Sequence, residues 1–159
     1  MSGLLDVNVL VALVVPEHEH HDTALTWYSS TANHSWATCA VTELGVIRVC
    51  AQLPGGAWLP ERTADQLLLL TADGRTHEFW PDPSSPAVMA EVRTAQTGKQ
   101  ITDRYLLGLA RRHGGKIVTF DGGIAAVGGD DVIRLLPSDS PSAAPAHGPT
   151  PHARPPRMK

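Results

Sequence analysis

The 159-residue chain has only two cysteines and no long apolar run, and each shortage excludes a class of protein. Cys39 and Cys50 lie near or within one predicted helix, so they are roughly 16 Å apart, beyond the reach of a disulfide bond. We expect both to be small buried side chains rather than a redox pair. The longest apolar run, residues 9–15, is too short to cross a membrane, so we predict no membrane association.

The chain also lacks a secretory signal and an excess of positive charge. No basic segment precedes the apolar run and no small-residue cleavage site follows it, so we expect a cytoplasmic protein. Residues 1–136 contain ten Lys and Arg against fifteen Asp and Glu. Proteins that bind nucleic acids nonspecifically usually carry a basic stripe. Contact with RNA must therefore use a local patch and a metal ion, or the help of a partner.

Several catalytic motifs are missing as well. The chain has no Gly-x-Ser-x-Gly elbow, which argues against a serine hydrolase of the α/β type. It has neither a Gly-x-x-x-x-Gly-Lys phosphate loop nor a Gly-x-Gly-x-x-Gly dinucleotide fingerprint. The chemistry must come from other residues.

Short apolar segments alternate with helical patterns through residues 1–136. We predict strands at 3–6, 35–38, 77–80, 116–120 and 132–136. Helices are predicted at 18–30, 40–52, 63–72, 87–95 and 102–112, the last of them capped by Thr102. In the second helix the apolar positions at helical spacing are Val41, Leu44, Ile47 and Ala51. This alternation predicts an α/β sandwich with a mainly parallel central sheet of four to five strands flanked by helices.

The composition changes after residue 136. Residues 137–159 hold seven of the thirteen prolines, together with Ser and Ala and almost no large apolar side chain. Such a segment cannot bury enough surface to offset its ordering entropy. We therefore expect one domain over residues 1–136 and a disordered Pro/Ala/Ser-rich tail over 137–159.

Four acidic residues lie where predicted strands end or predicted helices begin: Asp6, Glu43, Asp103 and Asp121. In an α/β protein those ends meet along one edge of the sheet. Carboxylates gathered there repel one another by roughly 1 to 4 kcal/mol per close pair, so they need a divalent cation. Oxygen ligands without a His or Cys spacing favour Mg²⁺ or Mn²⁺ over zinc. The sequence therefore predicts a metal-dependent hydrolytic site.

Each acid also has a simpler interpretation. Asp6 could cap the following helix, and Glu43 and Asp103 could be first-turn acids that the helix dipole stabilises. Asp121, which precedes two glycines, could be a turn residue. Asn8 could hold an oxygen of Asp6 or belong to a turn. The joint placement of all four acids favours the shared site.

A cationic patch is a further possibility. Arg104, Arg111, Arg112 and Lys116 could face phosphate groups beside Asp103. Favourable interaction of helix-end cations with the helix dipole explains Arg111 and Arg112 equally well.

Over roughly residues 1–136 the chain resembles the PIN-domain ribonucleases, specifically the VapC-type toxins of type II toxin–antitoxin pairs. LLDVNVLVAL resembles the opening strand with the first acidic residue, and TELGVIRV the helix that carries a glutamate. ITDRYLLGLA resembles the third acidic segment and VTFD the fourth. The ITD-x-YL-x-x-LA run joined to K-x-VTFD is the most specific part, and FWPDPSS resembles the segment before that helix.

The resemblance implies a PIN-like three-layer sandwich and a Mg²⁺-dependent endoribonuclease. Asp6 and Asp103 would be the principal metal ligands, with Glu43 and Asp121 completing the acidic pocket. The family's toxins are inhibited by a cognate antitoxin and usually form homodimers, which the leucines at 67–70 could serve. Arg104 departs from the small residue common after the third aspartate, which could alter substrate grip.

Two other functions fit part of the pattern. A non-catalytic PIN-like module could use the acidic pocket to dock an arginine of a partner protein. A phosphatase of the haloacid dehalogenase type would also place an aspartate after its first strand. That family requires Asp-x-Asp, however, and here the second position is Asn8.

Overall fold

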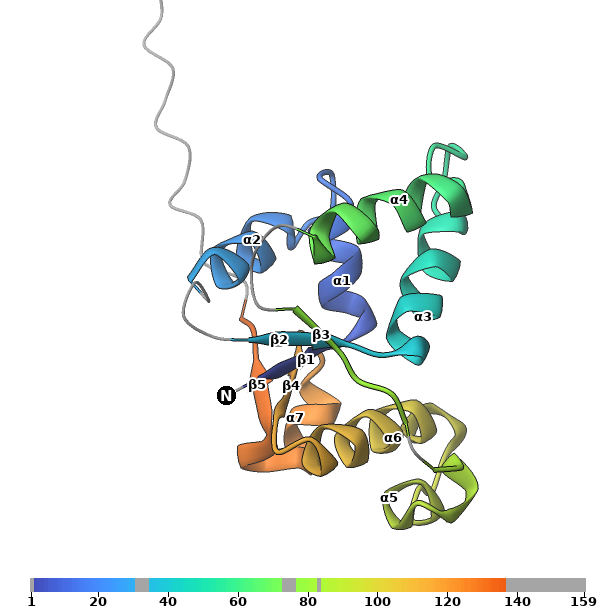
Figure 1. Ribbon diagram of the computed structural model, residues 1–159, viewed down its shortest axis with the longest axis vertical. Helices are drawn as coiled ribbons and strands as arrows, with labels where there is room; N and C mark the ends of the chain where they lie inside the picture. Colours follow the sequence, from blue (N-terminus) through green and yellow to red (C-terminus); the bar gives the residue numbers. More distant parts are fainter. Residues whose placement is uncertain (1, 31–34, 73–76, 83, 137–159) are drawn as a thin grey trace, which may run out of the picture.

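A computed structural model describes residues 2–30, 35–72, 77–82 and 84–136. Figure 1 shows a central sheet between two layers of helices. The five strands are all parallel in the order β3-β2-β1-β4-β5: β1 (Gly3–Leu5), β2 (Trp36–Thr38), β3 (His77–Phe79), β4 (Lys116–Thr119) and β5 (Val132–Arg134). Each lies within a segment predicted as a strand, and the predicted α/β sandwich is confirmed. The predicted tail, 137–159, lies outside the described residues.

The sheet divides the core in two because successive strand side chains point to opposite faces. Leu5 and Val118 pack into the hydrophobic cluster on one face. Leu4 and Ile117 pack into the cluster on the other face. Apolar side chains on both faces are typical of a parallel sheet covered by two helical layers.

One layer contains four helices: α1 (Val7–Val14), α2 (His21–Ser30), α3 (Ala40–Ala51) and α4 (Pro60–Thr71). The apolar positions predicted for α3 share the inward face only in part: Val41 and Ile47 pack against the core, whereas Leu44 is 69% exposed. Gly45 and Val46 are buried instead. A Cβ at Gly45 would lie 2.5 Å from Val7 Cγ2, so the absence of a side chain lets α3 approach α1 closely. This tertiary contact decides which face turns inward.

The other layer contains α5 (Ala90–Arg93), α6 (Gly98–Arg112) and α7 (Gly122–Gly128), with 3-10 turns η1 (Pro86–Val88) and η2 (Gly129–Asp131). Helix α6 begins before the predicted start, with Thr97 as its N-cap residue, so Thr102 is not the cap. Lys99 and Gln100 are good helix formers and extend the helix toward the N-terminus. Asp103 therefore lies in the second turn of α6 rather than at its start.

Cys39 and Cys50 are each 1% exposed and form no disulfide bond with each other, as predicted. Within the described ranges, no helix is both long enough and apolar enough to cross a membrane.

The topology creates a crevice between β1 and β4. The chain leaves β1 into α1 on one face of the sheet, and it leaves β4 into α7 on the other face. Ligands of open α/β sheets bind at such a switch point, outside the carboxyl ends of the strands. Asp6 follows β1 directly and Asp121 follows β4 by two residues, so both lie at this crevice.

Candidate active site

Asp6 is the one buried residue among the four predicted acids, with 8% of its surface exposed. As the N-cap of α1, its Oδ1 accepts a hydrogen bond from the Val7 amide at 2.7 Å. Its Oδ2 accepts from Asn8 Nδ2 at 2.9 Å and from Thr119 Oγ1 at 2.7 Å. A carboxylate has about four acceptor positions, so about one remains open to a cation.

Opposing influences act on the pKa of the Asp6 carboxyl. Burial raises the pKa, and the charge of Asp121 raises it further. The hydrogen bonds from Thr119, Val7 and Asn8 lower it in part. Asp6 therefore caps a helix, as its simpler interpretation holds, and it is also a buried carboxylate held in a polar network.

Thr119 and Asn8 tie the ends of β1 and β4 together. The Thr119 hydroxyl donates to Asp6 and accepts from the Asp121 amide at 2.9 Å. Asn8 donates to Asp6 and accepts at Oδ1 from the Phe120 amide at 3.2 Å. The predicted role of Asn8 in holding an Asp6 oxygen is confirmed, and the network fixes Asp6 relative to Asp121.

Asp121 begins helix α7 rather than a simple turn. Its Oδ1 accepts from the Gly123 amide at 2.5 Å and caps the helix. This cap explains why a segment predicted only as a turn forms a helix despite its glycines. The side chain is exposed, which leaves Oδ2 accessible to solvent.

Asp103 projects from α6 and is partly buried. Burial raises the pKa of its carboxyl, and the charges of Asp6 and Asp121 raise it further. In the part of the chain that the structure describes, no hydrogen bond or salt bridge engages this side chain. The charges of two other carboxylates thus raise the pKa of Asp103, and no described residue pairs with it to offset them.

Glu43 is held by a different set of residues. It lies in the first turn of α3, and its Oε1 accepts from the Thr38 hydroxyl at 2.6 Å. His77 Nε2 lies 2.9 Å from the same hydroxyl oxygen. Because the single hydroxyl proton goes to Glu43, His77 Nε2 is the donor. Burial lowers the pKa of His77, while Glu43 and Glu78 raise it in part.

The structure therefore brings three of the four predicted acids into one electrostatic cluster: Asp6, Asp103 and Asp121. Glu43 lies in the first turn of α3, which follows the neighbouring strand β2, and its charge raises the pKa of His77. The four acids do not form one uniform group.

The carboxylates fit a hard divalent cation only with outside help. Among the described residues, no group of three or more His, Cys, Asp and Glu side chains is arranged to hold a metal ion by itself. Mg²⁺ typically takes one or two protein carboxylates and completes its shell with water and substrate phosphates. Asp6, with an open acceptor position, and Asp103, without a hydrogen-bond or salt-bridge partner among the described residues, would supply such a pair. The donor set suits Mg²⁺ or Mn²⁺.

The predicted cationic patch is wrong for three of its members. Arg111 pairs with Asp131 at 2.7 Å, and Arg112 pairs with Asp82 at 3.5 Å. Both arginines are in the last turn of α6, where the helix dipole favours cations. Lys116 is the first residue of β4, so it lies at the amino edge of the sheet, opposite to the acids.

Arg104 remains beside the acids. It lines a pocket of about 270 Å³ together with Asp103, Asp121 and Lys99. No salt bridge within the described ranges engages either cation. Negative and positive side chains therefore face one cavity without neutralising each other.

The residues that sequence reasoning missed are Thr38, Thr119 and His77. Both threonines are fully buried, and each ends a strand just before an acidic segment. A threonine at the last position of an otherwise apolar strand is the signal that could have identified them. His77 carried no such signal, because its link to Glu43 depends on the pairing of β3 with β2.

A family model described as the PIN domain matches residues 3–130. Ribonuclease VapC39 of Mycobacterium tuberculosis is 34% identical over 140 residues, which cover 86% of this chain and 100% of that protein.

Two further relatives come from the same organism. Ribonuclease VapC29 is 39% identical over 138 residues, covering 87% of this chain and 98% of the relative. Ribonuclease VapC44 is 39% identical over 127 residues, covering 79% and 89%. These matches span between 89% and 100% of the relatives' own length. The residues that the PIN-domain model matches, 3–130, include all four predicted acids.

Proposed function

Because the chain belongs to the PIN-domain family and, within it, to the VapC-type ribonucleases, we propose that it is a Mg²⁺-dependent endoribonuclease. One observation carries this proposal. Burial and the charge of Asp121 raise the pKa of Asp6 at the β1/β4 switch point, burial and the charges of Asp6 and Asp121 raise the pKa of Asp103, and no salt bridge in the described part of the chain offsets these charges. A site built to receive a cation and a phosphodiester has this electrostatic character.

Each acid has its own role in this proposal. Asp6 and Asp103 hold the metal, while Asp121 and Glu43 complete the pocket and orient the attacking water. When bound, Mg²⁺ polarises a phosphoryl oxygen and lowers the pKa of water. The network of Asn8 and Thr119 keeps the Asp6 carboxylate fixed, so its open acceptor position is preorganised. Glu43 uses Oε1 on Thr38, which leaves Oε2 for water.

The partners follow from the same family assignment. We propose that the chain is the toxin of a two-protein module in the cytoplasm, with RNA as substrate. A cognate antitoxin would inhibit it by covering the acidic crevice.

A homodimer is part of the proposal, with α4 as the contact. Leu68 and Leu69 on α4 are 67% and 65% exposed. Exposure of two adjacent leucines to water is unfavourable, and a second copy of the chain would cover them. Changing both to Lys should convert a dimer into a monomer, measured by light scattering. Val88→Lys, at an equally exposed apolar position on the other layer, is the control. A wild-type protein that is monomeric at all concentrations contradicts this contact.

Cleavage by purified protein tests the central proposal. Wild-type protein should cut single-stranded RNA with Mg²⁺ and stop when a chelator is added. Asp6→Asn should abolish cutting while leaving a folded protein that still binds its antitoxin. Cleavage that survives the chelator, or that Asp6→Asn retains, contradicts the assignment. A folded wild-type protein that binds a partner but never cuts RNA would instead support the non-catalytic module.

A further inference from the structure

The pocket beside the acids has two chemically different walls. Asp103 and Asp121 line it on the side of the candidate active site. Leu107, Ile124 and Val127 form an apolar wall from α6 and α7. A partly open pocket with an apolar surface next to charged groups is typical of a site for a small organic ligand rather than a bare ion.

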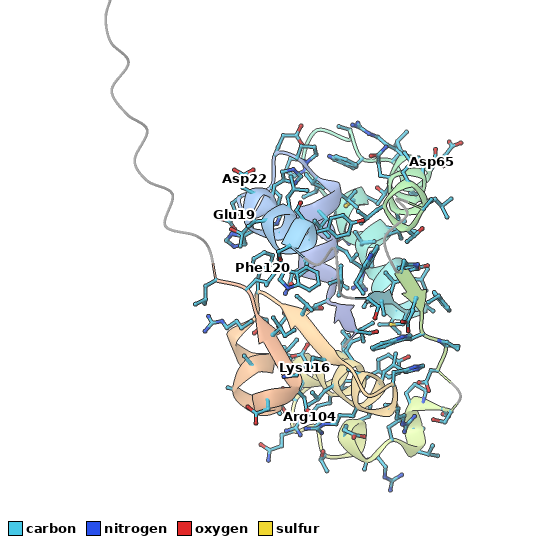
Figure 2. All side chains as sticks on the ribbon, turned by 60° about the vertical axis from the view of Figure 1, so that its left-hand side comes forward. Glu19, Asp22, Asp65, Arg104, Lys116 and Phe120 are labelled. Carbon is cyan, nitrogen blue, oxygen red and sulfur yellow. The ribbon has the colours of Figure 1, made fainter. Side chains whose placement is uncertain are left out.

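Cationic and amide groups complete the lining. Lys99, Gln100 and Arg104 come from the first two turns of α6. Figure 2 shows Arg104 on the side of the sheet that carries α6 and α7, far from Asp65 on α4.

Arg104 is the least satisfied of these groups. Its Nε is buried and has no hydrogen-bond partner in the described part of the chain. A buried donor without a partner costs free energy that a ligand can recover. The other two arginines of the same helix, Arg111 and Arg112, are paired with acids. Arg104 Nε is therefore a buried donor that no described residue satisfies and that a ligand could satisfy.

We propose that this pocket is a nucleotide subsite, which receives one unstacked base of the RNA next to the phosphate that is cut. The inference rests on the proposed function, because the acids at the pocket's edge are the proposed cleavage site. The base lies on the apolar wall, and the guanidinium of Arg104 stacks on it or bonds to its edge. Sequence-specific recognition of RNA commonly uses unstacked bases stacked on arginine planes.

The size of the pocket supports a single nucleotide. Its volume of about 270 Å³ is just below the range of roughly 300–1,000 Å³ for drug-sized ligands. Gln100 offers both a donor and an acceptor, and Lys99 offers a donor, so the rim can distinguish base edges. A free phosphate is less suited, because Asp103 and Asp121 face the same space. Arg104 and its neighbours thus determine cleavage specificity rather than the chemical step.

The test measures base-dependent binding separately from cleavage. Short labelled single-stranded RNAs, each lacking one base, are titrated against the full chain by fluorescence anisotropy in the presence of a chelator. Removal of one particular base should weaken binding by wild-type protein roughly tenfold. Arg104→Ala should bind the intact RNA about as weakly as wild type binds that abasic RNA, and should no longer respond to the missing base.

Two further variants make the result decisive. Val127→Trp fills the pocket from a position that is 45% exposed, so folding should tolerate it, and it should also abolish the dependence on that base. Arg48→Ala, which removes an exposed arginine from α3 outside the pocket lining, should behave as wild type. Sequencing of the cleavage products should show that Val127→Trp changes the preferred base beside the cut.

The outcomes separate this inference from the proposed function. If wild type cleaves RNA but Arg104→Ala and Val127→Trp keep both its base dependence and its cleavage sequence, the subsite is refuted and the nuclease stands. If wild type shows the base dependence and both variants lose it, the subsite stands even when no cleavage occurs. Equal binding of every abasic RNA by wild type also refutes the subsite.

Discussion

The two halves of the acidic edge solve the problem of a partly buried carboxylate in different ways. At the β2/β3 half, Glu43 receives a hydrogen bond from Thr38, which His77 supports in turn. At the β1/β4 half, Asp6 and Asp103 have pKa values raised by burial; the charge of Asp121 raises both further, and the charge of Asp6 also raises that of Asp103.

This difference indicates which half depends on a ligand. The Glu43 half is satisfied by the protein's own donors, so its geometry is established before anything binds. In the aspartate half, burial and charge repulsion disfavour the charged carboxylates, and near neutral pH a bound cation would offset both. We therefore expect substitutions in the aspartate half to change metal binding, and substitutions in the Glu43 half to change the rate more mildly.

The largest effect is expected from Asp103→Asn. Loss of a principal metal ligand removes several kcal/mol of transition-state stabilisation, which should lower the cleavage rate at least about 10³-fold. The metal-free variant should be no less stable than wild type in thermal unfolding near neutral pH. In the wild type, burial and the charges of Asp6 and Asp121 raise the pKa of the Asp103 carboxyl above 3.8, so the charged form of this carboxyl opposes folding.

The sign of this effect can be checked with pH. A raised carboxyl pKa gives stability that is present at low pH and is lost as the pH rises through the folded-state pKa. The metal-free wild type should therefore become less stable than Asp103→Asn in thermal unfolding as the pH rises above 3.8. Asp65→Asn, on the exposed surface of α4, is the matched control and should alter neither measurement. A destabilised Asp103→Asn variant would mean that Asp103 has a structural partner.

A smaller effect is expected from Glu43→Gln. Groups that support a metal site without being its principal ligands typically contribute about 10- to 100-fold, so cleavage should fall by that amount without being abolished. Stabilisation of the protein by Mg²⁺, measured as a rise in Tm, should persist in Glu43→Gln and disappear in Asp103→Asn. Equal loss of the Mg²⁺ response in both variants would erase the distinction between the halves.

The strands could be predicted because their signal is local. Four of the five are short, mainly apolar segments bounded by polar or turn residues, and their positions require no knowledge of their neighbours; β3 (His77–Phe79) is more polar and is bounded by Pro81. The buried face of α3 could not be predicted, because it depends on the approach of Gly45 to Val7 in another helix. Helix α7 depends on the capping bond of Asp121, and α6 begins after Thr97 without a side-chain capping bond, so composition alone reveals neither start.

The site shows the same division. The acidic residues stand out because charge beside apolar strands is costly, so their clustering could be inferred from topology. The hydrogen bond between Thr119 and Asp6 joins residues 113 positions apart. The hydrogen bonds that link His77 to Glu43 through Thr38 cross from β3 to β2. Such contacts exist only after the strands pair. The different electrostatic character of the two halves was therefore hidden in the sequence.

The smallest effect is expected from Thr38→Val, which removes the hydroxyl between His77 and Glu43 with little change in shape. Without this hydrogen bond, the Glu43 side chain should adopt other rotamers. Cleavage should then fall about tenfold, the lower end of the range for residues that support a metal site. Lost hydrogen bonds should reduce the free energy of unfolding by about 1 kcal/mol. Thr26→Val, which removes an exposed hydroxyl that bonds to the Asp22 carbonyl, is the control.

Because Thr38 acts through Glu43, the two substitutions should not be additive. Thr38→Val should leave the rate unchanged in a protein that already carries Glu43→Gln, since there is no carboxylate left to orient. An additive double variant would show that Thr38 contributes by another route, for instance by holding His77 against Trp36, whose rings lie 4.5 Å apart. The β2/β3 half would then support the edge of the sheet rather than the reaction, and only the aspartate half would belong to the active site.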